Sequence, residues 1–122
     1  MPAKLLAIDD ETEFTSLIQG YFSSRGYQVM VANDGQVGLK IAKEQRPDLC
    51  LIDLKMPGLH GDEVMRQILE IYPDMKCIMI TASEGEEKTR SHLIELGAYT
   101  WFDKPLTSLR DLESKIKEAL KP

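Results

Sequence analysis

Cysteine, histidine and long hydrophobic runs are all scarce in this sequence. The two cysteines, Cys50 and Cys77, lie inside apolar runs and lack the short paired spacing of a zinc site, so we interpret them as buried free thiols. The longest apolar runs are a handful of residues, far short of a membrane span. An acidic pair interrupts the first run, which excludes the layout of a signal peptide. The sequence therefore predicts a cytoplasmic protein without a membrane partner.

Positive charge is also in short supply. The 15 lysines and arginines are outnumbered by 20 aspartates and glutamates, and the formal net charge is −5. This balance disfavours direct binding to nucleic acid, which basic surfaces recognise, and binding to an anionic membrane surface. The 122 residues match the usual size of one domain and suffice to bury a core without disulfides or a structural metal.

Apolar residues occur in two alternating patterns. Short continuous runs predict strands buried on both faces of a parallel sheet, at 5–8, 49–52 and 77–80, with weaker strand patterns at 27–32 and 98–102. Helical spacing predicts helices at 14–22, 37–42, 64–69, 86–96 and 109–120. Five strand–helix units predict one doubly wound α/β domain over residues 1–122, with helices on both faces of the sheet and no second domain in this chain.

Acidic residues follow two central strands of the predicted sheet. Asp9 and Asp10 come directly after the first strand, and Asp53 comes directly after the third. Ligands of open α/β sheets bind beyond the carboxyl ends of the strands. Carboxylates about 5 Å apart repel by roughly 3 kcal/mol per pair at an effective dielectric constant near 20, which raised pKa values or a bound cation would offset. Oxygen ligands favour Mg²⁺ or Mn²⁺, and neither His60 nor His92 lies at these strand ends to bind zinc.

A hydroxyl and a lysine reach the same edge of the predicted sheet. Thr81 follows the fourth strand, with Ser83 two residues later, and Lys104 follows the fifth. A carboxylate beside a divalent cation, with a lysine and a hydroxyl facing it, suits attack on phosphorus. The carboxylate can itself be the nucleophile and become an acyl phosphate. Asp53 stands alone at its strand end and suits that role, whereas we expect the neighbouring acids Glu11 and Asp103 to be solvated.

The motifs "LLAIDDE", "LIDLKMPG", "IMITA" and "WFDKP", in this order and spacing, resemble the receiver domain of two-component response regulators, the CheY-like family. The resemblance implies a (βα)5 flavodoxin-like, three-layer fold with strand order 2-1-3-4-5. It implies that Asp53 accepts a phosphoryl group from a sensor histidine kinase or phosphotransfer protein. Asp9 and Asp10 match the acidic pair that holds Mg²⁺ with Asp53. Lys55 occupies the position whose backbone carbonyl completes the metal site.

The resemblance also implies a switch. Thr81 matches the switch hydroxyl, Lys104 the lysine that pairs with the phosphoryl group, and Pro105 the proline after a cis peptide bond. Trp101 stands where the family usually has Tyr, Phe or His, an aromatic residue that swings inward with Thr81; the other interpretation is a Trp that only packs at the surface of the fourth helix. The implied output surface is formed by the fourth helix, fifth strand and fifth helix, and it would contact a partner or output domain. The only chemistry implied is self-phosphorylation and slow autodephosphorylation, without an enzyme's turnover.

Three rival functions are weighed against this one. A phosphatase of the aspartate-nucleophile class needs a second acid two residues after the first, and that position is Lys55. A flavodoxin-like FMN carrier needs a glycine- and hydroxyl-rich phosphate loop after the first strand, where "DDETEF" would repel phosphate. A degenerate receiver that acts only as a protein-interaction module stays open as the alternative, although none of the acids, the hydroxyl or the lysine is missing.

Strand parity gives one further prediction. Cys50 lies three residues before Asp53, and Cys77 lies four residues before Thr81. If Asp53 and Thr81 occupy equivalent positions, alternation along extended strands points the two thiols to opposite faces of the sheet, so we expect no disulfide between them.

Overall fold

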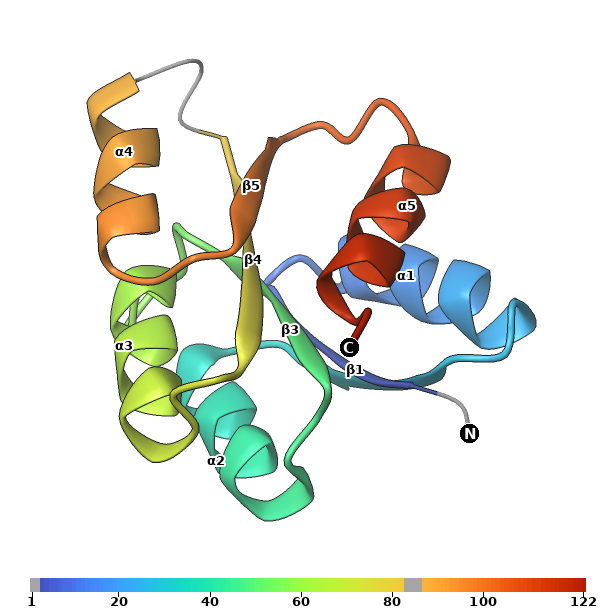
Figure 1. Ribbon diagram of the computed structural model, residues 1–122, viewed down its shortest axis with the longest axis horizontal. Coiled ribbons are helices and arrows are strands. Elements are labelled where there is room, and N and C mark those ends of the chain that lie inside the picture. The colour runs from blue at the N-terminus through green and yellow to red at the C-terminus, as the bar shows by residue number, and fades with distance from the viewer. Residues whose placement is uncertain (1–2, 83–86) are drawn as a thin grey trace.

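The computed structural model describes residues 3–82 and 87–122, so Ser83 lies outside the described residues. Strands and helices alternate along the chain in the predicted order (Figure 1). The elements are β1 (Lys4–Ile8), α1 (Thr12–Ser24), β2 (Gln28–Ala32), α2 (Gly35–Gln45), β3 (Leu49–Asp53), α3 (Gly61–Ile71), β4 (Lys76–Thr81), α4 (Glu87–Glu95), β5 (Thr100–Asp103) and α5 (Leu109–Ala119).

The strands form one parallel sheet in the order β2-β1-β3-β4-β5, which confirms the predicted topology. Helices α1 and α5 cover one face, and α2, α3 and α4 cover the other (Figure 1). Along β1, Leu5 and Ala7 pack toward α1 and α5, whereas Leu6 and Ile8 pack toward the other three helices. Because both faces are covered, the central strands carry continuous apolar runs instead of alternating apolar and polar residues.

Local signals set the helix ends. Gly26, predicted from the sequence to end the first helix, lies just beyond α1 with a φ of +95°, a conformation that favours glycine. The Asp34 side chain accepts a 2.8 Å hydrogen bond from Val37 N at the start of α2, and the Ser108 side chain accepts one of 3.1 Å from Asp111 N at the start of α5. These caps satisfy backbone donors that the first helical turn leaves unpaired.

The register of β3 and β4 contradicts the predicted placement of the cysteines. Asp53 pairs with Ile80, so Thr81 lies one residue beyond the end of β3. Cys50 and Cys77 are therefore register partners, and both face the core under α2, α3 and α4. The prediction of opposite faces was wrong because it assumed that Asp53 and Thr81 were level. Both thiols are nonetheless free and fully buried.

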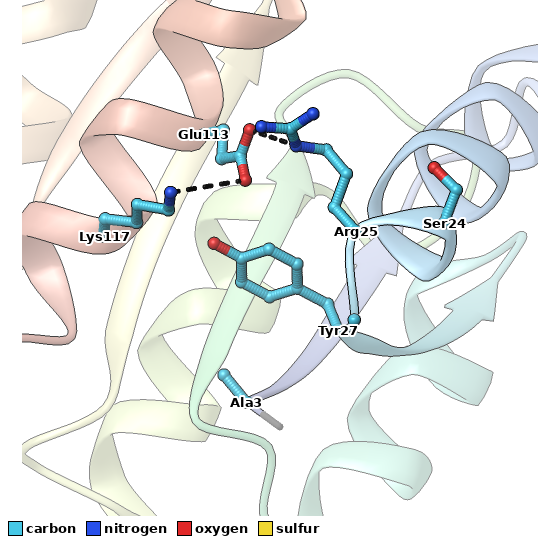
Figure 2. A pocket seen from close by; sticks show the side chains of 7 residues that line it. Ala3, Ser24, Arg25, Tyr27, Glu113 and Lys117 are labelled. Atoms are coloured by element: carbon cyan, nitrogen blue, oxygen red, sulfur yellow. Dashed lines mark ion pairs between the residues drawn. The ribbon is translucent and has the colours of Figure 1, made fainter. Parts of the chain in front are cut away.

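An ion pair between a buried carboxylate and an exposed arginine joins the end of α1 to α5. Glu113 of α5 is 5% exposed and its carboxylate lies 2.6 Å from Arg25 Nε and 3.7 Å from Lys117 Nζ (Figure 2). It also accepts a 3.1 Å hydrogen bond from the Tyr21 hydroxyl. A pocket of about 440 Å³ adjoins this cluster, and Ala3 in its lining precedes β1. The pocket therefore opens at the amino ends of the strands, away from the predicted site.

No helix in the described ranges is both long and apolar enough to cross a membrane.

Candidate functional site

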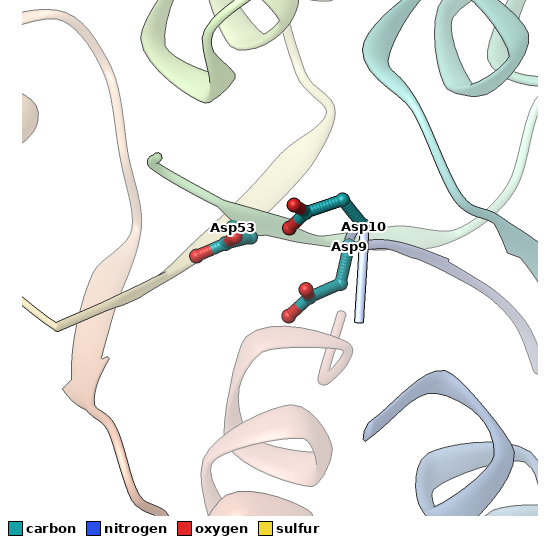
Figure 3. Close-up of side chains that lie close together, drawn as sticks. All are labelled: Asp9, Asp10 and Asp53. Carbon is teal, nitrogen blue, oxygen red and sulfur yellow. The ribbon is translucent and has the colours of Figure 1, made fainter. Parts of the chain in front are cut away.

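Three aspartates meet at the carboxyl ends of two neighbouring strands. Asp9 and Asp10 follow β1, Asp53 is the last residue of β3, and the two strands pair directly. Each side chain offers a carboxylate oxygen within 4.8 Å of the other two, and all three lie on the same side of the strand ends (Figure 3). The strand order reverses between β1 and β3, which is where such sheets bind ligands.

Burial gives this cluster unusual electrostatics. Asp9 and Asp53 are 1% and 5% exposed, whereas Asp10 is exposed. Burial, followed by the negative charge of Asp9, raises the pKa of Asp53 from 3.8 to about 7, although Lys104 acts in the opposite direction. Burial also raises the pKa of Asp9, against the effect of its contact with Lys104. The cluster thus favours a proton or a cation.

The donor set of the three aspartates fits a hard cation. All three side chains offer carboxylate oxygens, which Mg²⁺ and Mn²⁺ prefer over the nitrogen and sulfur ligands typical of zinc. His60 precedes α3 as an exposed residue and His92 is exposed on α4, so neither adds a ligand to the cluster. Lys55 lies in the loop directly after β3, and the part assigned to its carbonyl stays a prediction.

Lys104 brings positive charge to the aspartates from the end of β5. Its Nζ lies 2.7 Å from Asp9 Oδ2, 2.6 Å from Glu11 Oε1 and 3.7 Å from Asp53 Oδ1. Partial burial lowers the pKa of Lys104, but the contacts with Asp9 and Glu11 outweigh it, so the pKa is raised overall. The bond between Lys104 and Pro105 is cis. Glu11 is exposed, as expected, but it also pairs with this lysine.

Thr81 reaches the same edge from β4. It is fully buried, and its carbonyl accepts a 2.8 Å hydrogen bond from Lys104 N, which ties the ends of β4 and β5 together. The structure thus gathers Asp9, Asp10, Asp53, Thr81 and Lys104 at one edge of the sheet.

Comparison with known proteins identifies this arrangement. The family model described as "Response regulator receiver domain" matches residues 5–117. The chain belongs to the response regulator receiver domain family. The receiver domain resembles a crystal structure of a CheY-like response regulator receiver domain protein from Methanospirillum hungatei, with a TM-score of 0.91, 30% identity, and coverage of 98% of this chain and 94% of the other.

Two curated relatives come from Bacillus subtilis. Sporulation initiation phosphotransferase F is 36% identical over 94% of this receiver domain and 94% of its own length. The alkaline phosphatase synthesis transcriptional regulatory protein PhoP is 35% identical over 99% of this chain. The receiver domain spans only 50% of PhoP, so that protein is about twice as long.

Asn33 is a residue of the receiver site that sequence reasoning missed. It follows β2, and its Nδ2 donates hydrogen bonds of 2.9 Å to Asp9 O and 3.0 Å to Thr15 Oγ1. These two bonds connect the backbone of Asp9 to the Thr15 side chain of α1 and hold that backbone in place. Its signal in the sequence is a polar residue directly after the second strand, like the polar residues that follow the other four strands.

Gly61 is a second missed residue of the receiver site. Helix α3 begins at Gly61, whose N–H donates a 2.9 Å hydrogen bond to Leu54 O. A Cβ at this position would lie 2.0 Å from the backbone oxygen of Asp53, far inside van der Waals contact. The absence of a side chain therefore lets α3 start directly against the Asp53 backbone. A single glycine at the start of a helix does not reveal this close contact in the sequence.

Trp101 of the receiver domain lies under α4. It is partly buried, packs against the core on the α2–α4 side, and has Arg90 Cζ 5.7 Å from its ring centroid. Arg90 also lies 2.6 Å from Asp103 Oδ2, so Asp103 is exposed, as the sequence predicted, and is also paired. Arg90 thus links α4 to Trp101 and Asp103 of β5, the strand that leads to Lys104.

Proposed function

We propose that this receiver domain is a phosphoacceptor and that Asp53 takes the phosphoryl group. The observation that supports this most directly is the placement of the Asp53 carboxylate, 5% exposed at a strand end, among two other aspartates and 3.7 Å from a lysine ammonium. A rigid, buried strand holds a nucleophile in a fixed orientation. The donor is a phosphohistidine on a sensor histidine kinase or a phosphotransfer protein.

The transfer is a single displacement at phosphorus. One Asp53 carboxylate oxygen forms a bond to phosphorus while the phosphorus–nitrogen bond of the donor breaks. The electron pair of that bond stays on the imidazole nitrogen, which takes up a proton. Asp53 must be ionised to attack; in the metal-free chain its pKa is raised to about 7, and a bound cation would oppose that shift and favour the reactive form. The domain is modified by this reaction and does not turn over a substrate.

Asp9, Asp10 and Asp53 would hold Mg²⁺ or Mn²⁺, with the Lys55 carbonyl as a further ligand. When bound, the cation would neutralise charge on the phosphoryl oxygens. Lys104 would contact those oxygens as a second positive charge, and Thr81 would donate a hydrogen bond to one of them.

Phosphorylation would change the surface formed by α4, β5 and α5. The added charge and acceptor oxygens favour inward movement of Thr81 and Lys104, and Trp101 would repack into the space that Thr81 leaves. A shift from 1:99 to 99:1 between two conformations requires about 5.5 kcal/mol of differential interaction. Two charge-assisted hydrogen bonds, one from Thr81 and one from Lys104, at about 1.5–3 kcal/mol each, come close to that free energy. The altered surface would bind an output domain or a partner protein.

The test uses a small acyl phosphate as donor in the presence of Mg²⁺. We expect the wild-type chain to gain the mass of one phosphoryl group, which hydroxylamine removes from an acyl phosphate, and we expect Asp53→Asn to gain none. Labelling of Asp53→Asn to the wild-type extent contradicts the proposal. A folded wild-type chain that takes no label from acyl phosphate or phosphoramidate would instead support the degenerate receiver.

A further inference from the structure

Lys104 divides its contacts between the aspartate cluster and a carboxylate outside it. Its Nζ lies 2.7 Å from Asp9 Oδ2 and 2.6 Å from Glu11 Oε1, and the contact with Glu11 has hydrogen-bond geometry. Asp53 Oδ1 is farther away, at 3.7 Å, beyond hydrogen-bond distance. The ammonium that faces the predicted phosphoryl position is therefore bound mainly by residues that follow β1.

The main chain of Glu11 is fixed by its surroundings. Its N–H donates a 2.9 Å hydrogen bond to Asp9 Oδ1, and its carbonyl accepts hydrogen bonds of 3.1 and 3.2 Å from the N–H groups of Phe14 and Thr15. Although Glu11 is the N-cap residue of α1, its side chain makes no capping hydrogen bond. The carboxylate reaches Lys104 instead. The same ammonium lies over the Phe14 ring, 5.0 Å from the ring centroid.

We propose that Glu11 is a positioning residue that competes with the phosphoryl group for Lys104. The inference rests on the proposed function, because the competition matters only if Asp53 is phosphorylated. To contact the phosphoryl oxygens, the Lys104 ammonium must give up or share its contact with Glu11. The Glu11 side chain is 64% exposed, so this contact is a modest one and can be exchanged. Glu11 thus slows phosphorylation and weakens binding of a phosphoryl analogue.

Neutralising Glu11 tests this competition. In Glu11→Gln, we expect the initial rate of labelling by a small acyl phosphate at saturating Mg²⁺ to rise about two- to five-fold, the range that an exposed ion pair is worth. Equilibrium affinity for beryllofluoride with Mg²⁺, a phosphoryl analogue, should rise by a similar factor. Affinity for Mg²⁺ alone, measured by calorimetry, should change no more than in the control variant, because Glu11 is outside the aspartate cluster.

Glu13→Gln is the matched control. Glu13 is exposed in the first turn of α1, so its substitution removes the same charge from the same helix. We expect its labelling rate and beryllofluoride affinity to stay close to wild type. Equal acceleration in both variants would overturn the inference, because it would show that net charge, and not the contact with Lys104, controls the rate.

A double-mutant cycle shows whether the effect passes through Lys104. In a Lys104→Met background, the gain in beryllofluoride affinity from Glu11→Gln should disappear, since the ammonium for which Glu11 and the phosphoryl analogue compete is gone. A gain of unchanged size in that background, or wild-type values for Glu11→Gln alone, contradicts the role of Glu11 and leaves the proposed function standing. A wild-type chain that takes no label contradicts the proposed function, and this inference with it.

Discussion

The Asp53 carboxylate lies where its charged form is costly to the folded state. A pKa raised from 3.8 to about 7 means that the folded chain holds a proton that the unfolded chain releases, so stability falls as pH rises through this interval. At about 1.4 kcal/mol for each tenfold change in proton affinity, the full cost is about 4 kcal/mol. In metal-free buffer, we expect Asp53→Asn to be more stable than wild type by about 2–4 kcal/mol at pH 8.

The pH dependence separates this effect from a general effect of charge. The advantage of Asp53→Asn should shrink between pH 7 and pH 4, because wild-type Asp53 becomes protonated there. Urea unfolding at several pH values, with a chelator present, measures it. Asp74→Asn, at an exposed position before β4, should show no such advantage. An Asp53→Asn variant that is less stable than wild type at pH 8 would contradict the electrostatic argument.

At the scale of single elements, α5 depends on one buried carboxylate. Glu113 is bound by Arg25 and Tyr21 of the α1 end, and its contact with Arg25 lowers its pKa. A lowered pKa means that this stabilisation is present above the unfolded value of 4.5 and is lost as pH falls through the folded pKa. We expect Glu113→Gln to cost about 1–3 kcal/mol of unfolding free energy at pH 7.

Urea unfolding at pH 7 and at pH 3 measures the cost of Glu113→Gln. The loss should be largest at pH 7 and smaller at pH 3, because the stabilisation from Glu113 is lost as pH falls through its lowered pKa. Glu118→Gln, five residues later on the exposed side of α5, is the control and should cost less than about 1 kcal/mol. A Glu113→Gln variant as stable as wild type at pH 7 would show that the cluster in Figure 2 does not stabilise α5.

Element order was predictable from the sequence, but strand register was not. Continuous apolar runs identified the central strands because both faces of the sheet are covered, and Gly26 marked the end of α1. Register depends on contacts between strands, which no single strand encodes. An offset of one residue between Asp53 and Thr81 was enough to bring Cys50 beside Cys77.

The candidate site shows the same division. The strand-end positions of Asp9, Asp53 and Lys104 follow from parallel topology, because carboxyl ends meet at one edge. The partners of Lys104 do not follow from topology, because they depend on which of several nearby acids its flexible side chain contacts. The contact between Lys104 and Glu11 therefore could not be predicted from the sequence and is seen only in the structure.

At the scale of the whole molecule, the acidic cluster should couple metal binding to folding. The unfolded chain does not hold Asp9, Asp10 and Asp53 together, so Mg²⁺ binds the folded state preferentially and stabilises it. At about 100 times the dissociation constant, the gain is about 2.7 kcal/mol. For a domain of this size, that corresponds to a rise in Tm of about 10 °C.

Calorimetric melts with Mg²⁺, against KCl at matched ionic strength, measure this coupling. The KCl control accounts for screening of the repulsion among the carboxylates. Asp10→Asn should reduce the rise in Tm, because it replaces a carboxylate at the exposed side of the cluster with a neutral amide. The rise should also be smaller at pH 6 than at pH 8, since a proton on Asp53 competes with the cation below a pKa of about 7. Equal Tm increases from Mg²⁺ and KCl would show that the three aspartates do not form a metal site.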